Sequence, residues 1–211
     1  MEFTSHFPDC FPLWQEAFGD SRDTVTRFLT TVPNRPFFAV EDGHLLSMLF
    51  AVPQAVGCHK AAYLYAVATA ERARGQGLAA QLLHHAEEAL KQDGFAACLL
   101  SPAKPELAAW YMRRGYESWG PWQPISATNI SGTPVSPEEY LLLREEKLKN
   151  VPHNIPPKEV LALYTLTAGG AWEGTQPVEL LSGRAPSPAP VMYKALQADF
   201  PETGYFSFVM D

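Results

Sequence analysis

The segment ERARGQGLAAQLLHHAEEAL, residues 71–90, places two arginines and two glycines immediately before an amphipathic helical pattern. Unpaired backbone N–H groups at a helix N-terminus carry a partial positive charge and can bind an anion. Glycine lets the anion approach the backbone closely, and Arg72 and Arg74 add formal charge. The segment therefore predicts an anion site, and the alternative is a tight strand-to-helix turn with solvated arginines.

Three phosphate-containing ligands compete for this segment. A P-loop needs Lys and then Ser or Thr after its last glycine, and Leu78 and Ala79 follow Gly77 instead, so nucleoside-triphosphate hydrolysis of that type is excluded. The run GQGLAA matches the relaxed dinucleotide pattern, but the acidic residue expected about 20 residues later is missing. The third ligand is coenzyme A, which the arginines ahead of the glycines favour.

The segment resembles the signature of the GCN5-related N-acetyltransferase (GNAT) family, which is Arg or Gln, two residues, Gly, one residue, then Gly or Ala. Arg72, Gly75 and Gly77 occupy its required positions. A second family element, a helix that carries Tyr and ends in Gly plus an aromatic residue, is similar to AAWYMRRGYE at residues 108–117. The resemblance covers residues 40–118 well and leaves the rest of the C-terminal half poorly covered.

The resemblance implies acetyl-CoA as the cosubstrate and a set of site residues. YLYAVAT, residues 63–69, stands where the family has a bulged strand that pairs with the pantetheine arm and offers the Val67 N–H to the acetyl carbonyl. Tyr111 is implied as the acid that protonates the sulfur, although spacing alone also fits a core aromatic beside Trp110. The implied cofactor-binding residues are Tyr65, Ala66, Val67, Arg72, Arg74, Gly75, Gln76, Gly77, Leu78 and Ala79.

By this resemblance the protein is an enzyme that transfers an acetyl group to a primary amine of a small acceptor by direct attack. The alternative is a non-catalytic module of the same fold that senses coenzyme A or binds a partner, and Tyr111 speaks against it. The sequence names no general base. One candidate is the terminal carboxylate of Asp211, because a mycobacterial aminoglycoside-acetylating branch of the family is similar in using its own C-terminus.

The elements that would position these residues follow from hydrophobic periodicity and turn signals. The N-terminal part predicts two short helices joined at Gly19, a hairpin turning at Asp42 and Gly43, and a strand over residues 61–69. A helix from Leu78 that ends at Gly94, a strand over 95–101, a helix over 105–114 and a strand from residue 116 follow. The expected fold class is α/β of the α+β type, a GNAT fold with a central mixed twisted sheet flanked by helices.

We expect two parts, an acetyl-CoA-binding domain at residues 1–120 and a C-terminal extension at 121–211 that completes the same domain or packs on it. The extension predicts a helix over 137–150, a strand over 159–166 and a closing strand over 204–210. With the first helices, this extension is expected to build the acceptor pocket. Aromatic residues such as Trp14, Trp119, Trp122 and Trp172 could line that pocket, but the core is the expected place for each of them.

Composition limits the partners. The 211 residues carry a formal net charge of −7, which disfavours nucleic acid as the main partner. Pro53 interrupts the most apolar run, so no membrane span is expected, and the N-terminus lacks the order of a signal peptide, so we expect a cytoplasmic protein. Three scattered cysteines predict neither a disulfide framework nor a zinc site, and no metal is expected. A homodimer is left open.

Overall fold

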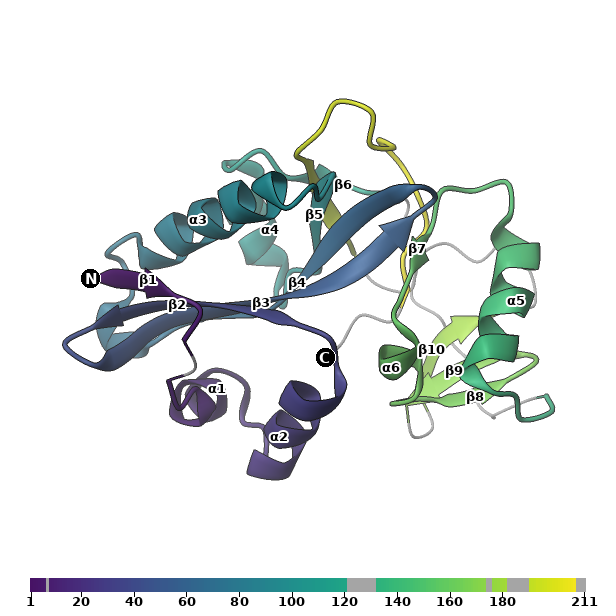
Figure 1. Cartoon of the computed structure of the whole chain (residues 1–211), viewed down its shortest axis with the longest axis horizontal. Helices are drawn as coiled ribbons and strands as arrows, with labels where there is room; N and C mark the ends of the chain where they lie inside the picture. Colours follow the sequence, from purple (N-terminus) through teal and green to yellow (C-terminus); the bar gives the residue numbers. More distant parts are fainter. Residues whose placement is uncertain (7, 121–131, 174–175, 182–189, 208–211) are drawn as a thin grey trace.

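A central mixed sheet organises the computed structural model, which describes residues 1–6, 8–120, 132–173, 176–181 and 190–207 (Figure 1). In this described part the sheet has eight strands in the order β1-β2-β3-β4-β5-β11-β6, with β7 paired to β3. Every pairing is antiparallel except that of β4 with β5. The strands are β1 (Glu2–Thr4), β2 (Arg35–Glu41), β3 (His44–Val56), β4 (His59–Thr69), β5 (Ala97–Leu100), β6 (Glu117–Ser118), β7 (Asn154–Ile155) and β11 (Met192–Ala195).

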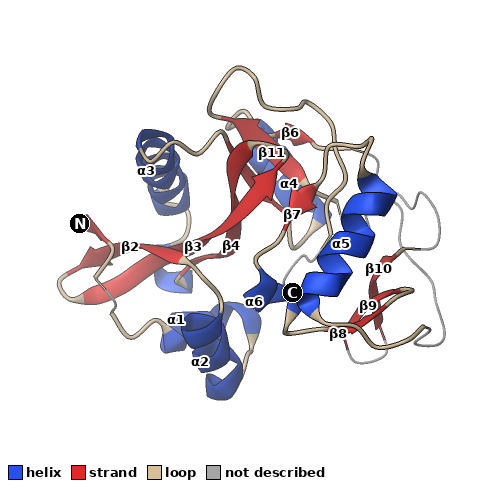
Figure 2. Ribbon diagram, turned by 45° about the vertical axis from the view of Figure 1, so that its right-hand side comes forward, coloured by secondary structure: helices blue, strands red, loops and turns tan. Residues whose placement is uncertain are grey.

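Helices cover both faces of this sheet (Figures 1 and 2). The helices α3 (Leu78–Gln92) and α4 (Pro105–Met112) pack on one face, and α1 (Phe11–Phe18) and α2 (Arg22–Thr31) pack on the other. The mixed α/β fold expected from the sequence is confirmed. In the described part of the chain no helix is both long and apolar enough to cross a membrane.

Local turn chemistry explains the N-terminal elements. Gly19 ends α1 in the left-handed conformation at φ 77°, which costs glycine no steric strain. Asp42 and Gly43 both have positive φ, 50° and 76°, as a two-residue type I′ hairpin turn requires. The predicted helix pair and the predicted hairpin are therefore confirmed.

The C-terminal part returns to the central sheet after an excursion. β11 lies between β5 and β6. Between β6 and β11 the chain makes an excursion that pairs with the central sheet only through β7 in the described residues, and it returns at Met192. The excursion contains a second, three-stranded sheet in the order β10-β9-β8. Besides β7, the excursion contains α5 (Pro137–Leu148), α6 (Lys158–Leu161), β8 (Thr165–Thr167), β9 (Gly170–Glu173) and β10 (Gln176–Leu180).

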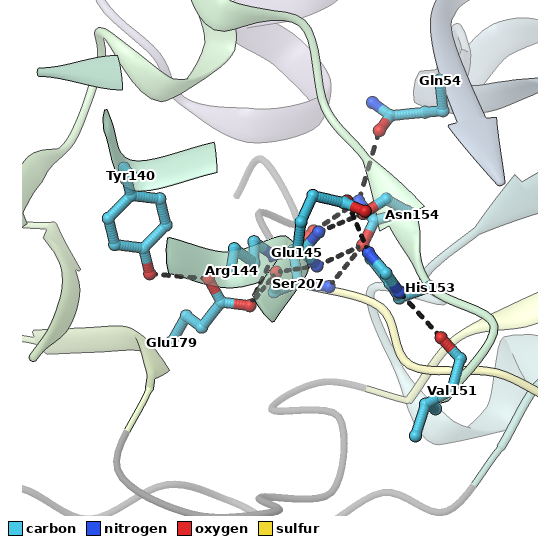
Figure 3. Close-up of polar contacts among 9 residues, drawn as sticks. All are labelled: Gln54, Tyr140, Arg144, Glu145, Val151, His153, Asn154, Glu179 and Ser207. Carbon is cyan, nitrogen blue, oxygen red and sulfur yellow. Dashed lines mark hydrogen bonds and ion pairs between the residues drawn. The ribbon is translucent and has the colours of Figure 1, made fainter. Parts of the chain in front are cut away.

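A cluster of buried polar side chains lies within this C-terminal part (Figure 3). Arg144 has 0% exposed surface, and its Nε donates to Glu179 at 2.8 Å. Its Nη2 donates to Asn154 Oδ1 and to Ser207 Oγ, each at 3.0 Å. The Tyr140 hydroxyl donates to the other Glu179 oxygen at 2.6 Å. These five residues, Tyr140, Arg144, Asn154, Glu179 and Ser207, are called the Arg144 cluster below.

The Arg144 cluster also joins the excursion to the central sheet. Asn154 pairs with Val56 as part of β7, and its side-chain amide donates to Gln54 Oε1 at 3.2 Å. Both partners belong to β3. The excursion is therefore fastened to the central sheet by backbone pairing and by a buried side-chain hydrogen bond.

Two strand predictions in the C-terminal part need comment. The strand expected over 159–166 is wrong, because α6 and a turn occupy most of it and only β8 at its end is extended. The carbonyl of Pro157 accepts from the N–H groups of Val160 and Leu161, and this closes a helical turn that buries both side chains. Of the strand expected over 204–210, Tyr205 forms a single bridge with His153, and residues 208–210 lie outside the described residues.

Candidate functional site

A β-bulge interrupts β4 beside its pairing with β3. Met48 faces Ala68 and Phe50 faces Tyr65, so Ala66 and Val67 together oppose a single residue of β3. Ala66 has a φ of 50°, a left-handed conformation that costs a residue with a Cβ about 1–2 kcal/mol. The bulge was predicted for this stretch, and it bends the strand and changes which side chains and N–H groups face each side.

The other edge of β4 parts from β5. Their parallel pairing runs from Ala61 opposite Ala97 to Tyr63 opposite Leu99, whereas β4 continues to Thr69. Beyond Tyr63 the strand edge therefore offers backbone N–H and C=O groups that β5 does not use. An extended ligand can pair with such an edge as an added strand does.

The glycine loop, residues 72–79, connects β4 to α3. Gly75 and Gly77 have φ values of 79° and 78°, a region that L side chains rarely adopt. Gly77 is the N-cap of α3, and no side chain caps this helix end. The backbone N–H groups of Leu78 and Ala79 are consequently available to an anion, as the sequence predicts.

Arg74 is held beside this helix end. Its Nε donates to the carbonyl oxygen of Thr69 at 3.1 Å, and its Nη2 lies 3.9 Å from Glu16 Oε1. The same Glu16 oxygen accepts from the Glu71 N–H at 2.7 Å, in the short 3-10 helix η1 (Glu71–Ala73). Arg74 thus keeps a defined position beside the uncapped end of α3, and Glu16 links α1 to the glycine loop.

A cavity of about 730 Å³ lies between the end of β4, the glycine loop and α4. Its volume falls in the range of cofactor and substrate sites. The predicted site residues that line it are Val67, Arg74, Gly75, Gly77, Leu78, Ala79 and Tyr111. Four other predicted residues, Tyr65, Ala66, Arg72 and Gln76, are not among its lining residues. Tyr65 instead packs on the opposite face, edge to face with Trp14 and tilted against Phe28, with ring centroids 5.8 and 5.0 Å away.

Tyr111 enters the cavity from α4. Its side chain is buried and meets the rings of Trp110 and Tyr116 edge to face, at centroid distances of 4.9 and 5.6 Å. Burial raises the pKa of Tyr111 to about 12, and the charge of Arg114 opposes that rise. The phenol therefore keeps its proton at neutral pH and can act as a hydrogen-bond donor or acid.

Several lining residues were not predicted from the sequence. Lys104, Trp110 and Arg114 line the cavity from or beside α4, and Phe18 lines it from the end of α1. Arg114 lies in the turn after α4, which ends at Met112, and no sequence pattern indicates that it lines the cavity. Asp211, the candidate base, lies outside the described residues.

Comparisons with known proteins place this geometry in context. A sequence model of the acetyltransferase (GNAT) family matches residues 2–116. A GNAT family N-acetyltransferase from Escherichia coli, solved in complex with CoA, aligns with a TM-score of 0.54 and 16% identity over 98% of this chain and 87% of that chain. A conserved Enterococcus faecalis V583 protein of unknown function aligns with a TM-score of 0.56 and 18% identity over 75% of this chain and 46% of that chain. At these identities the likeness shows a shared fold. No curated protein sequence matches the chain.

Proposed function

We propose, from the premise that this chain belongs to the GNAT acetyltransferase family, that it transfers the acetyl group of acetyl-CoA to a primary amine of a small acceptor. The observation that carries the proposal is a single cavity that joins three features. These are the bulged strand, the uncapped N-terminus of α3 and the buried, protonated Tyr111. Each feature supplies one part of what an acyl transfer from a thioester requires.

Cofactor binding uses the backbone in this proposal. The pyrophosphate lies on N–H groups of the Arg74–Ala79 stretch at the helix N-terminus, where Gly75, Gly77, Leu78 and Ala79 line the cavity. The pantetheine arm pairs with the β4 edge beyond Tyr63, where β5 no longer pairs. Arg72 and Gln76 belong to the same loop, and we retain them with Tyr65 and Ala66 as cofactor-binding residues through their backbone. The expected acetyl group then lies near Val67.

The chemistry needs a neutral amine, an oxyanion donor and an acid. The amine nitrogen attacks the thioester carbonyl carbon, and the Val67 N–H stabilises the oxyanion that forms. The C–S bond then breaks with its electron pair on sulfur, and Tyr111 donates its proton to that sulfur. The attacking amine loses a proton to water or to a base, and the terminal carboxylate of Asp211 remains our candidate for that base.

We propose one domain with two parts, an acetyl-CoA-binding part at residues 1–120 and an extension at 121–211 that completes it. Support comes from β11, which lies inside the central sheet between β5 and β6. Support also comes from β7, which pairs with β3. Because the excursion packs into the same hydrophobic core as α1 and α2, we expect it to help shape the acceptor site.

Binding and turnover test the proposal in sequence. Calorimetry with acetyl-CoA and NAD should show binding of acetyl-CoA and far weaker binding of NAD. A screen of primary amines with detection of the released thiol should then identify an acceptor. Micromolar binding of NAD without binding of acetyl-CoA would contradict the proposal. Binding of acetyl-CoA without thiol release for any amine would favour the non-catalytic module.

Tyr111→Phe is the decisive variant for turnover. It removes one hydroxyl and little volume, so we expect nearly unchanged acetyl-CoA affinity and a kcat lowered roughly 10²- to 10⁴-fold, the usual range for a general acid. Tyr193→Phe is the matched control, because Tyr193 is also buried but does not line the cavity. Equal kcat values for the two variants, with chemistry limiting the rate, would remove Tyr111 from the mechanism.

A further inference from the structure

Arg114 is a cation in the proposed active-site cavity that lacks a matching anion in the part of the chain that the structure describes. It lines the same cavity as Tyr111. Its Nη1 donates to the Trp110 carbonyl oxygen at 2.7 Å, and its Cζ lies 3.5 Å from the centroid of the Trp110 ring. These two contacts fix the guanidinium beside the end of α4.

The fixed guanidinium retains an unused donor. The Arg114 Nε is buried and has no hydrogen-bond partner among the described residues. The ion pairs of these residues do not include Arg114 either. The Nε itself is covered by protein, but Arg114 lines the cavity beside Tyr111 without an ion-pair partner among the described residues. A cation in such a cavity points to an anion that arrives with the ligand or forms during the reaction.

The proposed proton transfer creates such a group. A thiol has an ordinary pKa of about 8.5, and burial raises the pKa of Tyr111 to about 12. Transfer of the phenolic proton to a thiolate is then unfavourable by about 3,000-fold. It also leaves a tyrosinate in a buried place. A positive charge nearby offsets both difficulties, because it stabilises the anion in either position.

Other charged groups lie in or near the cavity. Lys104 and Glu106 line it together with Arg114. Glu87 of α3 accepts from the Tyr116 hydroxyl at 2.9 Å and from Lys194 Nζ of β11 at 2.6 Å. The buried Cys98 thiol of β5 also faces this group, and the carboxylate contributes to raising its pKa. Lys194 thus neutralises Glu87, and the charge of Arg114 is the one that opposes the rise in the pKa of Tyr111 caused by burial.

We propose that Arg114 is a positioning residue whose guanidinium stabilises the negative charge that acetyl transfer places on the coenzyme A sulfur and then on Tyr111. The inference rests on the proposed function. In the step concerned, the C–S bond breaks with its electron pair on sulfur, and the proton of Tyr111 moves to that sulfur. The tyrosinate regains a proton from water. Arg114 keeps its own proton throughout.

The first test needs no acyl donor. Protein labelled with 3-fluorotyrosine is titrated by ¹⁹F NMR, and the Tyr111 resonance is identified by its loss in Tyr111→Phe. Arg114→Gln should raise the pKa of Tyr111 by about one or more, so that phenolate formation falls about tenfold or more at a given pH. Arg114→Lys should raise it less. Arg113→Gln is the matched control, because Arg113 is exposed at the same helix end and does not line the cavity.

The second test measures kcat and KM with acetyl-CoA. Arg114→Gln should lower kcat roughly 10- to 100-fold with little change in KM, Arg114→Lys should recover part of it, and Arg113→Gln should retain it. Arg114→Met, which keeps an apolar stem over Trp110, replaces the Gln variant if thermal unfolding shows that the latter does not fold. An unchanged Tyr111 pKa in the neutral variant overturns the proposal. So does a defect seen only with succinyl-CoA, which would assign Arg114 to acyl recognition.

The two tests separate this inference from the function on which it rests. If the unaltered protein acetylates no amine, the proposed function fails, while the NMR titration still decides whether Arg114 acts on Tyr111. If the protein is active and Arg114→Gln retains full kcat, the proposed function stands and the inference about Arg114 fails.

Discussion

The glycine loop and the Arg144 cluster are both rich in polar groups and differ in how those groups are used. The loop takes its polarity from the backbone of one continuous segment, and it ends at a helix N-terminus that no side chain caps. The cluster takes its polarity from side chains of distant segments that bond one another, with Arg144 fully buried at its centre. Donors without partners in the protein indicate a ligand site, whereas donors and acceptors that bond one another indicate a structural contact between segments.

The difference predicts opposite sensitivities. A change that alters charge or backbone approach in the glycine loop should affect binding and spare the fold. A change that removes one member of the Arg144 cluster should affect the fold, because the remaining charge is left buried and unpaired. The variants below test this contrast, beginning with the largest expected effect.

Arg144→Met should cost about 3–5 kcal/mol in the free energy of unfolding, the typical result of removing one partner from a buried ion pair. Glu179 would lose the donor that lies 2.8 Å away. Adding Glu179→Gln should restore part of the loss, since no unpaired charge then remains. Urea unfolding measures both effects. Lys147→Met is the control, because Lys147 is exposed on the same helix. Similar losses of unfolding free energy in Arg144→Met and Lys147→Met would contradict the structural role of the Arg144 cluster.

The two regions also differ in how far the sequence reveals them. The glycine loop and the N-terminal elements were predictable, because each depends on neighbouring residues and on local φ preferences. The bulge was expected only from the family resemblance, because the positive φ of Ala66 runs against such preferences. The Arg144 cluster was not predictable. Arg144 lies among charged residues of a helical run, and its partners are 10, 35 and 63 residues away. No local pattern distinguishes it from a solvated arginine.

The same limit applies within the cavity. The sequence indicates Tyr111 through a motif and leaves Arg114 unmarked, because the unpaired state of its Nε depends on what packs around it. It also gives no sign that β11 enters the sheet between β5 and β6. Such long-range pairing is decided by the whole core. The glycine loop could therefore be predicted as a candidate anion site from local residues, whereas the position of Arg114 in the cavity could not.

Gly77→Asp should weaken acetyl-CoA binding by roughly 100-fold, which corresponds to about 2.7 kcal/mol. The added carboxylate would repel the pyrophosphate where it approaches the helix N-terminus. Gly77→Asn is a closely matched control, because Asn has nearly the same shape and tolerates the φ of 78° at this position about as well.

Calorimetry should show the Asn variant binding at least tenfold more tightly than the Asp variant. The added Cβ makes only an ordinary van der Waals contact, with Gln81 Nε2 at 3.8 Å. We therefore expect the unfolding free energies of both variants to stay close to each other. Equal acetyl-CoA affinities would show that shape and not charge decides binding, and the glycine loop would lose its role as an anion site.

The smallest effect concerns two side-chain helix caps, one on α5, which carries Arg144, and one on α2 in the N-terminal part. Ser136 caps α5 in a capping box, in which its N–H donates to Glu139 at 2.8 Å and its hydroxyl accepts from the Glu139 N–H. Ser21 caps α2 by accepting from the Thr24 N–H. Thr24 occupies the position in α2 that Glu139 occupies in α5, and it has no carboxylate. The hydrogen bonds from Ser136 lower the pKa of Glu139. Of these two N-caps, only that of α5 should therefore lose stability in acid.

The sign of the pH dependence follows from that lowered pKa. Ionised Glu139 contributes stability that is fully present above its unfolded pKa of 4.5, and the contribution is lost as the pH falls through the lower folded value. Glu139→Gln keeps the shape of the box and removes the charge. Its Tm should lie about 1–2 °C below that of the unaltered protein at pH 7, and the gap should close as the pH falls below 4.5. The Tm loss caused by Ser21→Ala should stay constant over the same range. A gap for Glu139→Gln that persists in acid would show that the two caps work alike.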